Sequence, residues 1–471
     1  MNSLVSRALR PVVALHGGER TVALLMFAYS FLAMTAWNIL RPLTKSRAIN
    51  DLGADNMPYV MLGAGLVIGL LMHQYTRAVR RLPRAWVIPV TQAGIVVLLV
   101  AFWALLRTGA VWVGVAFYVL GLILGLLLIS QFWTLANDIY DPRQAKRLFG
   151  FIGGGASLGG ALGAGITSTL IRQVGAANMV LVGAAALVAC TLVVLLILKH
   201  HRMRDNADLG LEEEGVSGRE ALRLLRESPH VKVIAVVIGF AAASAQIIDL
   251  QISLVAEAIS GAGGEDAIGA FLADIQFYVS IAGFVVQIAL TRWIHRTFGL
   301  GVALMLLPVA LGGSAAVILI TGAFWATGLA RVVDATLRYT VDKTTREVLF
   351  LPLPADLKQR AKPFIDVTAD RFAKAAAALV LLVLVKGFGL DWRQLSYASL
   401  ATMAIWIVAA LFARRQYLKA FRQSIGNQTI AADTIRTEVA DAATIETLVE
   451  ELSNPDPSAV LYAIGMLETF D

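Results

Sequence analysis

Repeated apolar runs of about twenty residues are the feature that most constrains how this chain folds. A bilayer core takes roughly 20 apolar residues of α-helix to cross, so each run of that length predicts a membrane span. Only 15% of the residues are charged, whereas a soluble domain has about 25%. We therefore expect an all-α, polytopic membrane protein. The sequence contains twelve such runs, which begin near residues 20, 57, 85, 111, 149, 176, 231, 268, 299, 323, 362 and 395.

The distribution of Lys and Arg predicts the orientation of these spans. With both termini in the cytoplasm, 29 of the 40 basic residues fall in cytoplasmic segments and 7 in outer loops. Cytoplasmic loops carry such an excess of positive charge in membrane proteins. Adding or removing one span would abolish the asymmetry, so the sequence predicts twelve spans with both termini cytoplasmic.

An internal repeat divides the chain into two six-helix halves. "QAKRLFGFIGGGASLGGALGAG" opens the fifth run and "RAKPFIDVTADRFAKAAAALVL" opens the eleventh, with Ala145 aligned on Ala361 and Lys146 on Lys362. A parallel repeat of six helices is typical of major-facilitator-like transporters. We predict a cytoplasmic segment 1–19, a half 20–198, a linker 199–230, a half 231–413 and a cytoplasmic tail 414–471.

The tail has the pattern of a helical repeat. "IETLVEELSNPDPSAVLYAIGMLETFD" places apolar residues on both sides of an Asn-Pro-Asp-Pro turn, which predicts the opening of a HEAT-like array and a possible protein partner there. Such arrays need at least about three repeats, and about one fits. Either the natural chain continues beyond residue 471, or the segment is a lone amphipathic appendage.

Charged residues recur inside the tenth and eleventh predicted spans. Residues four apart share one face of an α-helix, so Lys362, Asp366, Asp370 and Lys374 form one stripe, beside Arg371. A charge inside the membrane costs about 2.5–3.5 kcal/mol, and such residues usually line a path. The alternative is that they are ion pairs that hold helices together. In the tenth span Asp334, Arg338, Asp342 and Arg346 have the same spacing; the candidate gating or ion-pair residues are Arg331, Asp334, Asp249 and Asp274.

The end of the first span carries an unusual outer cluster of cations. "WNILRPLTKSRAIND" places Arg41, Lys45 and Arg47 on the outer side, against the charge rule. Recognition of an anion explains such a cluster, and a plain basic outer loop is the alternative. Pro42 should kink or end the helix there.

Two stretches resemble the nucleotide transporters typified by plastid and rickettsial ATP/ADP translocases. They are "FWTLANDIYDPRQAKRLFGFIGGGASLGG" and "LRYTVDKTTREVLFLPLPADLKQRAKPFIDVTADRFAKAAAA", and "NILRPLTKSR" resembles the first-helix motif of the same family. The resemblance implies exchange of ATP for ADP across a bacterial inner membrane, with phosphates bound by Lys45 and Lys374. The candidate substrate-binding residues are Arg41, Lys45, Asn137, Arg338, Asp366, Asp370, Arg371 and Lys374.

These features predict a secondary transporter of a phosphorylated anion, most simply a nucleotide. A membrane-anchored sensor or scaffold, a transporter of another organic anion or a phospholipid, and a proton-coupled exporter of organic cations are the alternatives. The single cysteine and six scattered histidines form no nucleophile–base or metal-ligand pattern, so we expect no enzyme activity, no metal and no cofactor. The partners expected are the anion and the lipid bilayer, with no nucleic acid.

Overall fold

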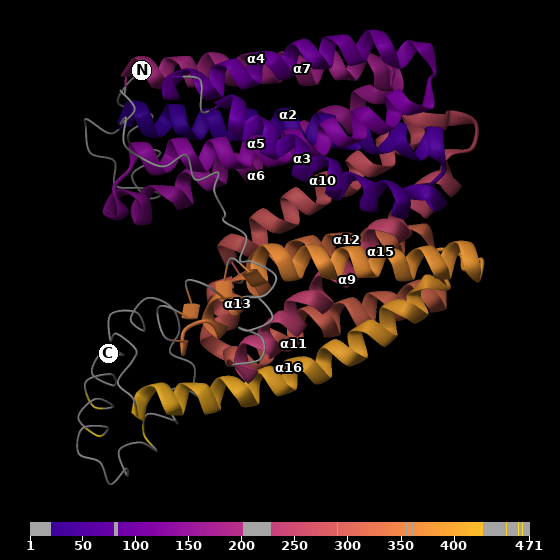
Figure 1. The fold of residues 1–471 in the computed structure, drawn as a ribbon. Coiled ribbons are helices and arrows are strands. Elements are labelled where there is room, and N and C mark those ends of the chain that lie inside the picture. The colour runs from indigo at the N-terminus through magenta and orange to yellow at the C-terminus, as the bar shows by residue number, and fades with distance from the viewer. Residues whose placement is uncertain are drawn as a thin grey trace. The chain divides into compact units, whose positions relative to one another are not determined.

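The computed structural model describes the predicted spans and little of the polar segments around them. Every regular element in the described part of the chain is helical (Figure 1), which confirms the all-α prediction. The predicted N-terminal segment, most of the linker and the HEAT-like part of the tail lie outside the described residues. The structure describes residues 20–79, 83–200, 228–289, 291–353 and 364–426, together with 357–358, 361–362, 449, 460 and 464.

The chain forms two compact units. Unit 1 consists of Met1–Glu212 and Ser253–Phe284, and unit 2 of Glu213–Ile252 and Val285–Asp471. Helix α9 (Pro229–Ser260) therefore contributes its first part to unit 2 and its last turns to unit 1.

Unit 1 is built around one long helix. Helix α2 packs against α5, α6 and α7, and α4 packs against α7 (Figure 1). Its buried face contributes Met26, Tyr29 and Leu40 to a core that also contains Phe117 and Leu187. The helices of this unit are α2 (Arg20–Leu52), α3 (Met57–Val79), α4 (Arg84–Leu105), α5 (Val111–Ile139), α6 (Pro142–Val174), α7 (Ala176–His200) and α10 (Gly264–Ala289) as far as Phe284.

Glycines bring α2 and α6 into backbone contact. A Cβ atom at Gly155 would lie 2.7 Å from the carbonyl oxygen of Phe27. Gly159 and Gly163 face the backbone of α2 in the same way, one and two turns further along. Small residues four apart allow such close approach between helices in a membrane. The glycine run of the fifth span therefore serves helix packing.

Unit 2 contains the charged spans. Helix α11 lies along α16 (Figure 1) and also packs against α12. Three short stretches of wider π-helix interrupt the α-helices: η4 (Arg338–Asp342), η5 (Phe364–Ala369) and η6 (Val383–Gly387). Besides the first part of α9, the α-helices are α11 (Thr291–Thr321), α12 (Phe324–Leu337), α13 (Lys343–Leu349), α15 (Asp370–Leu382) and α16 (Leu395–Gly426).

Ten helices in the described part of the chain are long and apolar enough to span a membrane. They coincide with ten of the twelve predicted runs. The runs that begin near residues 323 and 362 are also helical, but their α-helices of 14 and 13 residues end at π-helical stretches. These two α-helices are shorter than the 18 residues required of a candidate span, and both regions contain the charged residues of the tenth and eleventh predicted spans.

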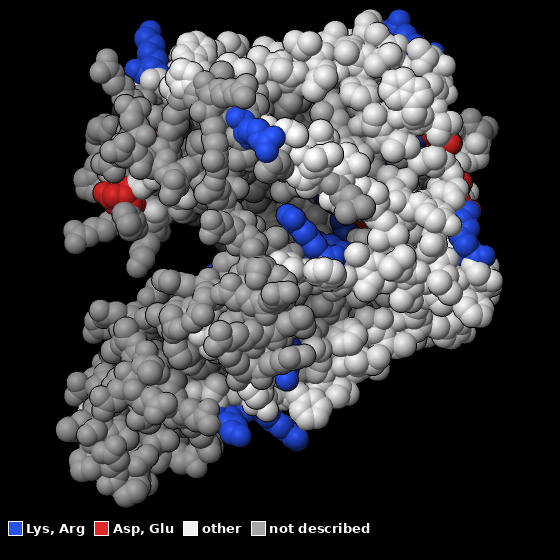
Figure 2. Space-filling view, in the orientation of Figure 1, with Lys and Arg blue, Asp and Glu red and all other residues white. Residues whose placement is uncertain are grey.

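The outer surface of the described helices is apolar. On the face in Figure 2 most of the described residues are uncharged, with a few Lys, Arg, Asp and Glu side chains among them. Large apolar side chains are exposed, for example Leu70 (62%), Val97 (69%) and Ile320 (79%). A soluble protein rarely exposes contiguous apolar surface of this kind. The fold is that of a polytopic membrane protein.

Candidate functional site

Helix α2 presents two cations one turn apart. Arg41 and Lys45 are both partly buried. The guanidinium of Arg41 lies 5.2 Å from the ring centre of Trp37, and its Nη1 donates a hydrogen bond of 3.0 Å to Oε1 of Gln276 on α10. Helix α2 does not end at Pro42, contrary to one expectation from the sequence, but continues to Leu52. Both cations therefore project from a continuous helix.

The third cation of this cluster has a different environment. Arg47 forms ion pairs with Asp51, at 2.7 Å, and with Glu265 of α10, at 3.0 Å. Two carboxylates neutralise its charge, so Arg47 fastens α2 to α10 and is poorly suited to attract an anion.

The two remaining unit 1 candidates lie on separate helices. Asp274 of α10 accepts a hydrogen bond from the hydroxyl of Ser168 on α6, so this carboxylate connects two helices within the membrane region. Asn137 lies near the end of α5 and is exposed. The neighbouring Asp138 is buried, at 7% exposure.

In unit 2, about two helical turns carry a chain of alternating charges, Arg331, Asp334 and Arg338. The carboxylate of Asp334 is buried (1% exposed) and accepts a hydrogen bond of 3.1 Å from Nε of Arg338. Arg331 lies 3.6 Å from Asp334 and 4.0 Å from Asp249 on α9. Nη1 of Arg338 also donates 2.6 Å to the carbonyl oxygen of Ala241. Arg331 thus bridges Asp249 and Asp334, and a gating role for these residues stays a prediction.

The four charged residues that the sequence places on one face of the tenth span form two ion pairs rather than one continuous series. Asp334 pairs with Arg338, and Asp342 pairs with Arg346, whose Nε lies 2.7 Å from Oδ2. Between the pairs runs η4, and a π-helix needs about one more residue per turn than an α-helix. Residues four apart across η4 therefore do not lie on one face of the helix.

The eleventh span shows the same interruption. η5 covers Asp366, so this exposed residue does not continue the α-helical stripe. From Asp370 onward the helix is regular, and Nζ of Lys374 lies 2.6 Å from Oδ2 of Asp370. The Lys374 side chain remains 45% exposed, and Arg371 is exposed beside it. These two cations are the accessible charges of α15.

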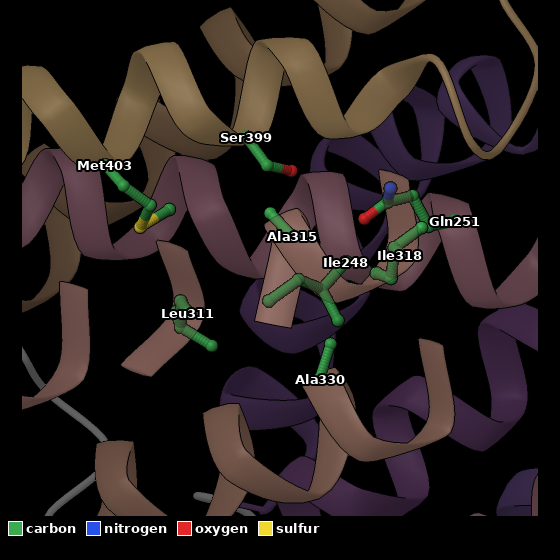
Figure 3. Close-up of a pocket in the computed structure, with 8 residues that line it drawn as sticks. All are labelled: Ile248, Gln251, Leu311, Ala315, Ile318, Ala330, Ser399 and Met403. Carbon is green, nitrogen blue, oxygen red and sulfur yellow. The ribbon is translucent and has the colours of Figure 1, made fainter. Parts of the chain in front are cut away.

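A small pocket lies between α9, α11, α12 and α16 (Figure 3). Its free volume is about 10 Å³, which is close to the space that one water molecule needs. The side chain of Gln251 lines this pocket (Figure 3). Its Nε2 donates hydrogen bonds to the carbonyl oxygen of Trp392 at 2.9 Å and to the hydroxyl oxygen of Ser396 at 3.0 Å. Ser399 also lines the pocket (Figure 3). The pocket is far too small for a nucleotide.

The candidate site residues predicted from the sequence are thus divided between the two units. Unit 1 contains Arg41, Lys45, Asn137 and Asp274; unit 2 contains Asp249, Arg331, Asp334, Arg338, Asp366, Asp370, Arg371 and Lys374. That cations from both units face a single anion cavity stays a prediction.

Comparison with known families identifies the fold. The sequence model of the Major Facilitator Superfamily matches residues 26–337. The chain belongs to the Major Facilitator Superfamily. A second family, the TLC ATP/ADP transporter, matches residues 314–417, which include the longer of the two stretches that resembled nucleotide translocases. The resemblance drawn from the sequence is therefore confirmed.

Relatives of this superfamily member are named as nucleotide carriers. The chain is 23% identical over 384 residues to ADP,ATP carrier protein 1 of Chlamydia muridarum, a match that covers 70% of each chain. It is 22% identical over 338 residues to the chloroplastic ADP,ATP carrier protein 1 of Arabidopsis thaliana, covering 64% of this chain and 53% of the relative. The prediction of a carrier rather than an enzyme is confirmed.

Solved structures of transporters share the fold. The nucleoside transporter NupG matches with a TM-score of 0.55 at 13% identity, covering 84% of this chain and 99% of its own. The POT family transporter PepTSo matches with a TM-score of 0.58 at 13% identity, covering 86% and 98%. At this identity the likeness concerns architecture alone.

Two residues beside Arg41 were not among the sequence candidates. Trp37 lies four residues before Arg41, a spacing that places both on one helix face, so its signal was present in the sequence. Gln276 is two residues from Asp274 but 235 positions from Arg41. No local pattern connects Gln276 with its partner.

Proposed function

We propose that this protein exchanges nucleotides, such as ATP for ADP, across a bacterial inner membrane by alternating access. The observation that supports this most is the TLC ATP/ADP transporter match over residues 314–417. That segment contains Arg338, Arg371 and Lys374. It lies in a chain of which 70% matches a relative named ADP,ATP carrier protein 1.

Phosphate recognition accounts for the accessible cations. Ammonium and guanidinium groups bind phosphate through charge-assisted hydrogen bonds. Lys45 and Arg41 of α2, and Lys374 and Arg371 of α15, are the residues to which we assign this role. Asp370 keeps Lys374 in place by their ion pair of 2.6 Å until a phosphate group replaces the carboxylate. Binding of the substrate would thus release Asp370.

The buried charge chain of unit 2 has a different role in this proposal. Asp334 holds Arg331 and Arg338 together, and Arg331 reaches Asp249 on α9 at 4.0 Å. These contacts connect two helices and can break and form as the helices move. We assign gating to Asp249, Arg331 and Asp334, and likewise to Asp274 through its bond with Ser168. Arg338, Asp366 and Asn137 complete the proposed substrate path.

The proposal includes the topology inferred from the sequence. The two charged helical regions, which contain α12 and α15, act as the tenth and eleventh of twelve spans in halves 20–198 and 231–413. Both termini lie in the cytoplasm, and the tail offers a surface to a protein partner. The excess of Lys and Arg in the predicted cytoplasmic segments supports this orientation.

A thermal-shift screen of the purified protein tests the substrate class. A ligand that binds only the folded state, present at 100 times its Kd, raises the free energy of unfolding by about 2.7 kcal/mol. We expect ATP and ADP to raise the unfolding temperature, and adenosine, glucose 6-phosphate and glycerophosphocholine to have little effect. Stabilisation by glucose 6-phosphate or glycerophosphocholine, with no effect of ATP or ADP, would instead indicate another organic anion or a phospholipid.

A further inference from the structure

Two neutral groups of unit 1 contact the guanidinium of Arg41. Its central carbon lies 5.2 Å from the ring centre of Trp37, and its Nη1 donates a hydrogen bond of 3.0 Å to Oε1 of Gln276. A cation over an aromatic face and a hydrogen bond to an amide oxygen both restrict how the guanidinium can turn.

The indole of Trp37 is itself fixed by a neighbouring helix. At Gly125 of α5, an added Cβ atom would lie 2.5 Å from Nε1 of Trp37 and 2.6 Å from its Cε2. Only a residue without a side chain leaves space for the ring at this point. Gly125 therefore seats the indole, and the indole supports Arg41 four residues further along α2.

The second support comes from α10. Oε1 of Gln276 accepts the hydrogen bond from Nη1 of Arg41 at 3.0 Å, so the guanidinium is held at two places, by the ring on its own helix and by the amide of another. Both supports and the arginine belong to unit 1. Arg41 remains only partly buried.

We propose that Trp37, seated against Gly125, and Gln276 are positioning residues that orient Arg41 toward the phosphate groups of a nucleotide. This rests on the proposed function, and it adds to that function the residues that preorganise one phosphate contact. An arginine that is free to rotate loses side-chain entropy when it binds, at about 0.5–1.5 kcal/mol for each immobilised side chain. Two fixed contacts remove that loss before the ligand arrives.

Equilibrium binding of ATP to the purified full chain tests the proposal. Gln276→Ala and Trp37→Leu should each weaken ATP binding by about two- to tenfold, and Trp37→Phe, which keeps an aromatic face, should restore most of the affinity. In protein that also carries Arg41→Gln, neither substitution should weaken ATP binding further. Exchange assays should show a higher KM with an unchanged maximal rate.

A matched control comes from a second arginine–tryptophan pair in the same unit. Arg107 lies 4.2 Å from the ring centre of Trp103, so Trp103→Leu removes a similar contact elsewhere and should leave ATP affinity unchanged. Should Trp37→Leu fail to fold, Trp37→Phe combined with Gln276→Ala replaces it, with an expected loss close to that of Gln276→Ala alone.

This design distinguishes failure of the proposed function from failure of the positioning role. If the wild-type protein binds neither ATP nor ADP, the proposed function fails and the positioning role with it. If the wild-type protein binds ATP, the positioning role alone fails when Gln276→Ala keeps wild-type affinity. It also fails when that substitution weakens binding by the same factor with Arg41→Gln as without it, because the two residues then act independently.

Discussion

Replacing Lys374 by Ala separates a role in binding from a role in folding. The ammonium of Lys374 lies 2.6 Å from Asp370, with side chains 45% and 24% exposed. An exposed pair four residues apart in a helix contributes about 0.3–0.5 kcal/mol, so the free energy of unfolding should fall by less than about 1 kcal/mol. A lost hydrogen bond between a charged group and phosphate weakens binding by about 1.5–3 kcal/mol. That corresponds to an affinity for ATP about 10- to 150-fold lower.

Titration with ATP and thermal unfolding of the same samples measure the two effects. Lys362 is the matched control, because it forms a pair of 2.6 Å with Glu347 and the two side chains are 36% and 38% exposed. Lys362→Ala should leave ATP affinity unchanged. The reasoning is refuted if Lys374→Ala lowers stability with unchanged affinity, and if adding Asp370→Ala then restores the stability. Lys374 would in that case only neutralise Asp370.

Two further substitutions test the packing within each unit. Asp334→Asn removes a carboxylate that is 1% exposed and paired with Arg338. Thermal unfolding should show that the free energy of unfolding falls by about 3–5 kcal/mol, and adding Arg338→Gln should restore part of it. An unchanged unfolding temperature would contradict the ion-pair assignment. Gly163→Leu should destabilise the protein by about 1–3 kcal/mol, because its Cβ would collide with the backbone of α2. Gly150→Leu, which has no atom within 4 Å of an added Cβ, should be tolerated, and equal losses at both positions would refute the contact.

The long apolar helices were predictable from the sequence, and the breaks within the charged ones were not. Hydropathy depends on composition, so spans such as Ala176–His200 stand out without any knowledge of their neighbours. The π-helical stretches η4 and η5 leave no comparable pattern. The spacing of four predicted one stripe through Asp366, Asp370 and Lys374, and the structure keeps only the last pair in register.

Contacts inside one helix were more predictable than contacts between helices. Asp334 with Arg338 follows from the period of the helix, and the structure contains this pair. The bond from Arg41 to Gln276 depends on how α10 packs against α2, and the two residues are 235 positions apart in the sequence. A single sequence carries no signal for such a pairing. The positive charge of Arg41 was therefore recognised, whereas the groups that orient it became visible only in the structure.

Exchange measured in vesicles tests the central claim most directly. The purified protein is placed in liposomes that contain ADP, ATP or no nucleotide, and uptake of labelled ATP is followed over time, with protein-free liposomes as the blank. The account predicts rapid uptake when nucleotide is present inside, little uptake when the lumen is empty, and strong reduction by Lys374→Ala. Absence of ATP uptake by folded protein under all of these conditions would contradict nucleotide transport, and equal uptake with and without internal nucleotide would contradict exchange.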